Sequence, residues 1–95
     1  MRYEWDERKR AANLEKHGLD FVDANLVFEA ALKATVEVTR AEDEEPRFVD
    51  FAEVRSAVLM LVYTMRRGAV RCISLRHAST RERKTLHEIS DREKD

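Results

Sequence analysis

Residues 58–77 read VLMLVYTMRRGAVRCISLRH and contain the pattern from which the fold can be derived. The first eight, residues 58–65, are almost wholly apolar, as in a strand that is buried on both faces. After the short break at Arg67, Gly68 and Ala69, residues 70–77 alternate between apolar and polar side chains, as a half-buried strand does. So short a connection predicts a hairpin, with residues 58–65 as the central strand of an antiparallel sheet.

The alternation also predicts which way the side chains of the second strand point. If it holds to the end of the strand, Ile73 and Leu75 face the core, and Ser74 and Arg76 face the opposite side. On this pattern Cys72 is expected to be a small buried or half-buried hydrophobic residue rather than a nucleophile.

Three further strands are expected, at residues 3–5, 32–38 and 47–54. In residues 32–38 the apolar residues occur at every second position, with Leu32, Ala34, Val36 and Val38 on one side. A two-residue connection at Arg55 and Ser56 predicts another hairpin. The stretch AEDEEP at residues 41–46 breaks the strand pattern and contains the only Pro, which indicates a loop.

Capping signals place three helices. Asp6 begins a helix over residues 6–17, which ends at Gly18, and Asp20 begins a second helix over residues 21–30. The second helix has an apolar face, made of Phe21, Ala24, Val27 and Phe28. Ser79 and Glu82 form a capping-box pattern that begins a third helix, which runs to about residue 90 and leaves DREKD as a frayed tail. The element order predicts an α+β fold with helices on one face of an antiparallel sheet.

Length and composition restrict the class of protein. The chain has 95 residues and a mass of 11.2 kDa, which predicts a single domain over residues 1–95 with its core at about residues 3–90. One Cys excludes a disulfide framework and fits a reducing compartment. Neither a membrane-spanning apolar run nor a signal-peptide pattern is present in the sequence, so a soluble cytoplasmic protein is expected.

The charge distribution is strongly polarised although the net charge is only −1. Residues 37–53 contain seven acids and two arginines, a net charge of −5. Residues 63–84 contain seven bases and one acid, a net charge of +6. This contrast indicates a cationic working surface for a polyanion, or alternatively a solvated charged face without a function.

Several motifs that indicate a catalytic or ligand-binding site in a small domain are absent from this sequence. The sequence has no metal-ligand spacing of His and Cys, no Gly-rich phosphate loop and no recognisable nucleophile with its base. What remains is the junction between the last strand and the last helix, which carries Arg76, His77, Arg81, Arg83 and Lys84. Arginines and a helix N-terminus suit phosphate, and a His can transfer protons near neutral pH. These groups match RNA cleavage without a metal, although His77 could equally serve in capping or packing.

A second basic group lies on the first helix. Lys9, Asn13, Lys16 and His17 recur at spacings of three and four residues and therefore share one face. Two interpretations stay open: a polar stripe opposite the core, or a second wall of the same cationic groove.

Four segments in this order resemble the BrnT family of toxins from bacterial type II toxin–antitoxin systems. They are EWDERKRAANLEKHGLDFVDA, RFVDF, LMLVYT and RCISLRHASTRER, and together they span about residues 3–90. The resemblance implies a RelE-like fold, that is, a twisted antiparallel sheet with helices packed on one face. It also implies a ribonuclease that cleaves mRNA and arrests translation and growth until an antitoxin binds it. Because the sequence contains no cluster of metal ligands, cleavage without a metal or other cofactor is expected. The implied partner is a ribbon-helix-helix antitoxin of the BrnA type, whose complex with the toxin binds operator DNA.

Site residues follow from the same resemblance. Lys16, His17 and Gly18 match the family's K-H-G motif, Arg76 its strand arginine, and Glu82 and Arg83 its helix E-R pair. Leu75 and His77 depart from the family pattern, which has a small residue and a Lys or Arg there. The expected catalytic residues are Arg76, His77, Glu82 and Arg83, and the expected RNA-binding residues are Lys16, His17, Arg71, Arg81 and Lys84. The alternative is a non-catalytic module of the same fold that binds RNA or the antitoxin and regulates.

Overall fold

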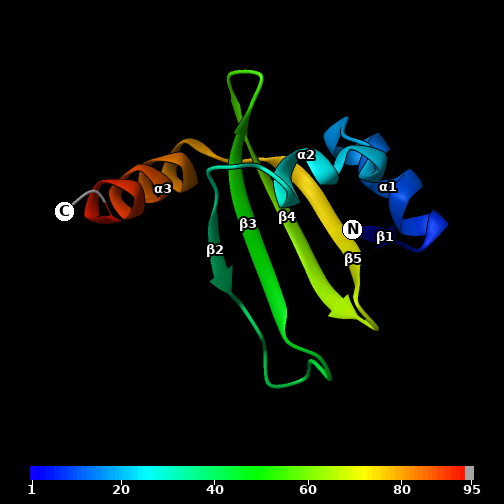
Figure 1. Cartoon of the computed structure of the whole chain (residues 1–95). Coiled ribbons are helices and arrows are strands. Elements are labelled where there is room, and N and C mark those ends of the chain that lie inside the picture. Colours follow the sequence, from blue (N-terminus) through cyan, green and yellow to red (C-terminus); the bar gives the residue numbers. More distant parts are fainter. Residues whose placement is uncertain (94–95) are drawn as a thin grey trace.

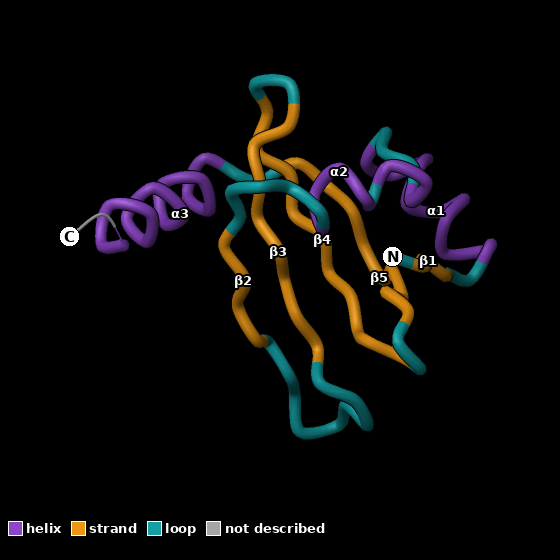
Figure 2. The backbone as a smooth tube through the Cα atoms, viewed as in Figure 1, coloured by secondary structure: helices purple, strands orange, loops and turns teal. Residues whose placement is uncertain are grey.

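The computed structural model describes the backbone of residues 1–93 and the side chains of residues 1–88. It contains one five-stranded sheet in the order β1-β5-β4-β3-β2 (Figures 1 and 2). The strands are β1 (Arg2–Glu4), β2 (Ala34–Glu37), β3 (Arg47–Val54), β4 (Ala57–Arg66) and β5 (Ala69–His77). The predicted central position of the apolar strand is confirmed, because β4 lies between β3 and β5.

The sheet is mixed, so the prediction of an antiparallel sheet is wrong for one strand. Strands β2 to β5 form an antiparallel meander, but β1 pairs with β5 in parallel, with Tyr3 opposite Val70. A hairpin forces its two strands to be antiparallel, whereas β1 reaches β5 from the other end of the chain and is free of that constraint.

Both tight hairpins have the backbone geometry that two-residue turns require. Arg55 and Ser56 have φ values of 51° and 70°, and Arg67 and Gly68 have φ values of 52° and 76°. Positive φ at both central positions gives a turn whose twist matches that of the flanking strands. Three of these four positions are not Gly, so the strand pairing holds them in a conformation that L-residues seldom adopt.

The helical elements are α1 (Glu7–His17), the 3-10 turn η1 (Phe21–Asp23), α2 (Asn25–Phe28) and α3 (Thr80–Glu93). The single helix expected over residues 21–30 is therefore two short pieces, although its apolar face of Phe21, Ala24 and Val27 is buried as expected. Leu32 is 88% exposed and precedes β2, so the strand begins two residues later than expected. The third helix continues past residue 90 to Glu93, and the last two residues of the expected frayed tail lie outside the described residues.

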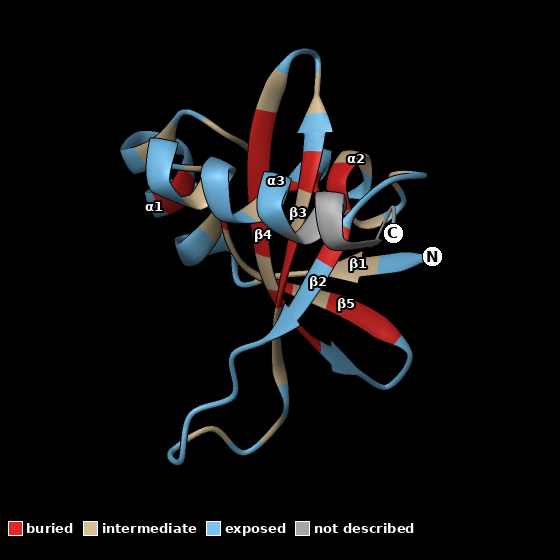
Figure 3. Ribbon diagram, turned by 90° about the vertical axis from the view of Figure 1, so that its left-hand side faces the viewer, coloured by how far each residue is buried: buried red, intermediate tan, exposed pale blue. Residues whose placement is uncertain are grey.

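The core lies between one face of the sheet and the segment η1–α2. Leu61 and Leu75, which face each other across β4 and β5, pack with Phe21 and Val27. Figure 3 shows the buried residues concentrated along β3, β4 and β5, whereas α3 is almost wholly exposed. In Figure 1, α3 extends beyond the β2 edge, so the expectation that all helices pack on one face is wrong for α3.

A register shift between Val62 and Tyr63 changes which side chains of β5 share a face. Ser74 lies opposite Val62 and Cys72 lies opposite Tyr63, which leaves Ile73 as an extra residue. Cys72 and Leu75 are consequently both buried in the core, and the side chains of Arg71 and Arg76 both point to the opposite face of the sheet. The prediction that Ile73 faces the core is wrong, because alternation ends at this bulge.

Candidate nucleic-acid interface

Arg76, at the end of β5, is held by the first turn of α3. Its guanidinium donates to both carboxylate oxygens of Glu82, at 2.8 and 2.7 Å, and to the carbonyl of His77 at 3.2 Å. These bonds use three of the five N–H groups of an arginine. One edge of the guanidinium, including Nε–H, has no partner among the described residues and is available to an anion.

Glu82 is placed by the capping box that the sequence predicts. Its carboxylate accepts from the backbone N–H of Ser79 at 2.8 Å, and the Ser79 hydroxyl accepts from the Glu82 N–H at 3.1 Å. Hydrogen bonds from Arg76 lower the pKa of Glu82 to about 2. Glu82 is therefore a carboxylate at neutral pH, and its two oxygens hold the guanidinium of Arg76 in place.

The other wall of the site is α1, which a buried amide attaches to β5. The side chain of Asn13 accepts from the N–H of Leu75 at 3.0 Å and donates to the Leu75 carbonyl at 2.8 Å. It also donates to the carbonyl of Leu19 at 2.9 Å, just after α1 ends at Gly18. Asn13 thus pairs with the edge of β5 as a strand would, one residue before Arg76. Because the backbone of Asn13 belongs to a helix, its side-chain amide makes the two hydrogen bonds that the backbone of a neighbouring strand would make.

Between α1 and β5 lies a shallow pocket of about 230 Å³. The residues that line it are Lys9, Ala12, Asn13, Lys16, His17 and Ile73. No carboxylate is among the described residues that line it. Desolvation, followed by the charges of Lys16 and Arg76, lowers the pKa of His17 below its usual 6.5. His17 is therefore neutral at physiological pH and lies within the electrostatic reach of Arg76. The four residues that share the basic face of α1, Lys9, Asn13, Lys16 and His17, all line this pocket.

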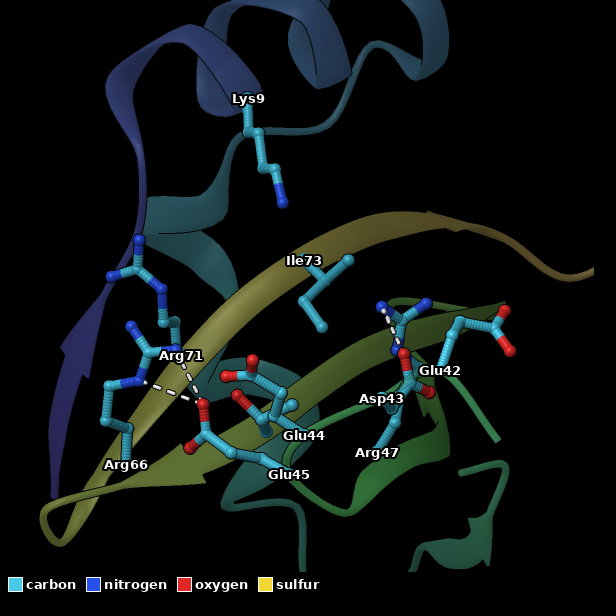
Figure 4. A pocket seen from close by; sticks show the side chains of 10 residues that line it. Lys9, Glu42, Asp43, Glu44, Glu45, Arg47, Arg66, Arg71 and Ile73 are labelled. Carbon is cyan, nitrogen blue, oxygen red and sulfur yellow. Dashed lines mark hydrogen bonds and ion pairs between the residues drawn. The ribbon is translucent and has the colours of Figure 1, made fainter. Parts of the chain in front are cut away.

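A second pocket, of about 240 Å³, continues from the first and shares Lys9 and Ile73 with it (Figure 4). Its far wall is the acidic loop, defined as residues 42–45. Glu45 binds Arg66 through Nε at 3.1 Å, and Asp43 binds Arg40 at 3.0 Å. We call the two pockets together the groove. Its α1 end is cationic, and its loop end contains four basic and four acidic side chains.

The structure places the expected site residues in different surroundings. Arg76 and Glu82 form an ion pair, and Lys16 and His17 line the first pocket. Arg71 lies in the second pocket and pairs with Glu4 at 3.4 Å. His77 is exposed and lies in register with Leu59, so it leaves the strand on the face opposite to Arg76. The exposed side chains of α3 include Arg81, Arg83 and Lys84, of which only Arg83 makes a side-chain bond, to Thr80 at 3.4 Å.

Two functional candidates were not among the expected site residues. Lys9 lines both pockets, and Asn13 is the buried anchor of α1. Their signal in the sequence is the spacing of four that joins Lys9, Asn13 and His17. That spacing is equally typical of a solvated stripe, because helical periodicity does not distinguish a polar side chain that faces water from one that bonds a strand edge.

Neither a metal cluster nor a membrane-spanning helix is found in the described part of the chain. No three His, Cys, Asp or Glu side chains there are grouped to hold an ion. Each described helix is too short or too polar to cross a bilayer.

Comparison with known proteins gives one family. The family model described as "Ribonuclease toxin, BrnT, of type II toxin-antitoxin system" matches residues 5–82, which include α1, the whole meander and the start of α3. No curated protein matches the chain.

Proposed function

Because the chain belongs to the BrnT family of ribonuclease toxins of type II toxin–antitoxin systems, we propose that it is a metal-independent endoribonuclease that cleaves mRNA in the groove. The observation that supports this proposal is that Lys16 and a neutral His17 line one pocket beside α1, within the electrostatic reach of Arg76 from the distant strand β5. A RelE-like arrangement of the fold and a cytoplasmic location are part of the same proposal.

The proposed reaction uses only protein groups and the RNA itself. His17 accepts the proton of a ribose 2′-hydroxyl, and the resulting oxygen attacks the adjacent phosphorus. The bond from phosphorus to the 5′-oxygen breaks, and the leaving oxygen takes a proton from the exposed ammonium of Lys16. Arg76, oriented by Glu82, binds the phosphate oxygens as negative charge develops on them. The products are a 2′,3′-cyclic phosphate and a 5′-hydroxyl.

The role of His17 follows from its protonation state. A general base must be unprotonated, and the lowered pKa of His17 keeps the imidazole neutral at pH 7. His77 is an alternative base, and Arg83 an alternative phosphate ligand. Both would need α3 and the end of β5 to rearrange before they reached the same phosphate.

The test is cleavage of a defined RNA by the purified protein in excess EDTA, with the ends identified by mass spectrometry. We expect 2′,3′-cyclic phosphate ends, no cleavage of RNA with a 2′-deoxy sugar at the cut site, and a large loss of rate in His17→Ala. His87→Ala, which changes an exposed His on α3, is the matched control. Complete inhibition by EDTA that Mg²⁺ reverses would contradict metal independence. RNA binding without cleavage would favour the regulatory alternative.

The family implies an antitoxin, and we propose that it is a BrnA-type ribbon-helix-helix protein that covers the groove and binds operator DNA in the complex. The exposed cations of α3 can steer an acidic partner at long range, so reversing the charges of Arg81 and Arg83 should slow association more than it speeds dissociation. Unchanged association kinetics at low salt would place the antitoxin elsewhere.

A further inference from the structure

The two ends of the groove differ in charge, and this difference limits what each end can bind. The α1 end presents Lys9 and Lys16 with no carboxylate beside them among the residues described, and suits phosphate. At the loop end, Arg66 is already bound by Glu45, and Arg47 lies 3.5 Å from Asp43. The four basic side chains of this end are offset by four carboxylates, so the RNA backbone is less favoured here than at the α1 end, where none of the described lining residues is a carboxylate.

What remains at the loop end suits a flat, uncharged group that has N–H donors. Ile73 supplies an apolar surface and Arg71 a guanidinium plane, and both kinds of surface stack against nucleobases. Glu44 is exposed, lines the same pocket and has no hydrogen-bond or ion-pair partner among the side chains described. Figure 4 shows Glu44 and Glu45 pointing from the loop toward β5, on which Arg71 and Ile73 lie.

We infer that the loop end is a nucleobase subsite in which Glu44 selects guanine next to the scissile phosphate. A carboxylate accepts two parallel hydrogen bonds, and guanine presents two adjacent donors, N1–H and the 2-amino group, on one edge. Uracil offers a single N–H between two carbonyl oxygens, which the carboxylate repels. Because the two pockets share Lys9 and Ile73, a base in one lies next to a phosphate in the other.

This inference rests on the proposed function, which assigns the α1 end of the groove to the scissile phosphate. Base selection can nevertheless be measured without cleavage. The probes are uracil hexamers with 2′-fluoro sugars, which cannot be cut, and with one position changed to guanine or to hypoxanthine. Hypoxanthine lacks the 2-amino group and so isolates its contribution. Each hexamer can slide until its variable base enters the subsite, so the binding register does not have to be fixed beforehand. Affinity is measured by fluorescence anisotropy at fixed salt.

We expect the hexamer with one guanine to bind on the order of 10-fold more tightly than the all-uracil hexamer, and the hexamer with hypoxanthine to have an intermediate affinity. Glu44→Gln should remove most of this preference, and Glu53→Gln, an exposed acid at the other end of β3, should keep it. Equal affinity for all three hexamers, or a guanine preference that survives in Glu44→Gln, would overturn the subsite. A protein that prefers guanine in this assay but cuts no cleavable RNA would support the subsite and overturn the proposed function.

Discussion

The helices α1 and α3 carry similar cations but are attached to the sheet in different ways. The buried side chain of Asn13 fastens α1 to β5 through two hydrogen bonds to Leu75, and Lys9, Lys16 and His17 consequently face the groove. By contrast, α3 has no buried side chain up to residue 88, and its firmest attachment is the ion pair from Glu82 to Arg76. Both helices are rich in cations, and the buried polar side chain of Asn13 is what holds the cations of α1 against the sheet.

The largest expected effect comes from the residue at which the two regions meet. Arg76→Ala removes the donor that both the groove and α3 use, and we expect cleavage to fall about 10²–10³-fold. Growth arrest on induction should be lost with it. Because the ion pair with Glu82 is lost as well, we also expect a lower thermal midpoint, and cleavage is compared well below it. A variant that melts like the wild type and still cleaves RNA and stops growth would remove Arg76 from the site.

The anchor of α1 comes next. Asn13→Ala leaves the Leu75 N–H and two carbonyls without their partner in a buried place, and an unsatisfied buried group costs about 1–3 kcal/mol. We expect the free energy of unfolding, measured in denaturant, to fall by about 2 kcal/mol or more, with loss of cleavage. Asn25→Ala, at an exposed position in α2, should change neither. If Asn13→Ala were as stable and as active as Asn25→Ala, Asn13 would not be the anchor that distinguishes α1 from α3.

The attachment of α3 should be sensitive to acid. The pKa of Glu82 is lowered to about 2, so its ion pair stabilises the fold above about pH 4.5, and this contribution is lost as pH falls from 4.5 toward 2. After allowing for partial solvent exposure, we expect a loss of about 1–2 kcal/mol over that range. In Glu82→Gln this part of the pH dependence should be absent, and in Glu88→Gln it should persist. Identical acid-unfolding curves for the wild type and Glu82→Gln would show that the pair is energetically neutral.

The smallest effect is expected on α3 itself. Replacing Arg81, Arg83 and Lys84 together by Ala should weaken RNA binding by only a few-fold at low salt, since these side chains act at long range, and the effect should fade as salt screens it. Replacing Lys9 and Lys16 should weaken binding more and at every salt concentration tested. The reverse ranking in an anisotropy titration would move the RNA from the groove to α3.

Local chemistry explains which parts of the structure were predictable. The strands β3, β4 and β5, the caps at Asp6 and Asp20 and the capping box at Ser79 depend on neighbours within a few residues. Hydrophobic periodicity and capping are signals on that scale, and they predicted these elements correctly. Periodicity failed where the bulge in β5 redirects Ile73 and where residues 21–30 form two short pieces instead of one helix. The family was also predictable, because its motifs are short runs in a fixed order, and the family model confirms it over residues 5–82.

The amino-acid sequence alone therefore specifies the elements, the central strand and the family, whereas the meeting of particular charged residues depends on the tertiary structure. The bulge at Ile73 exists only in the pairing of β5 with β4, and it places Arg71 and Arg76 on one face. Asn13 bonds a residue 62 positions away, which brings His17 within the field of Arg76. Contacts of this kind depend on strand register and chain crossings, and a local pattern of polar and apolar residues is the same whether or not they form.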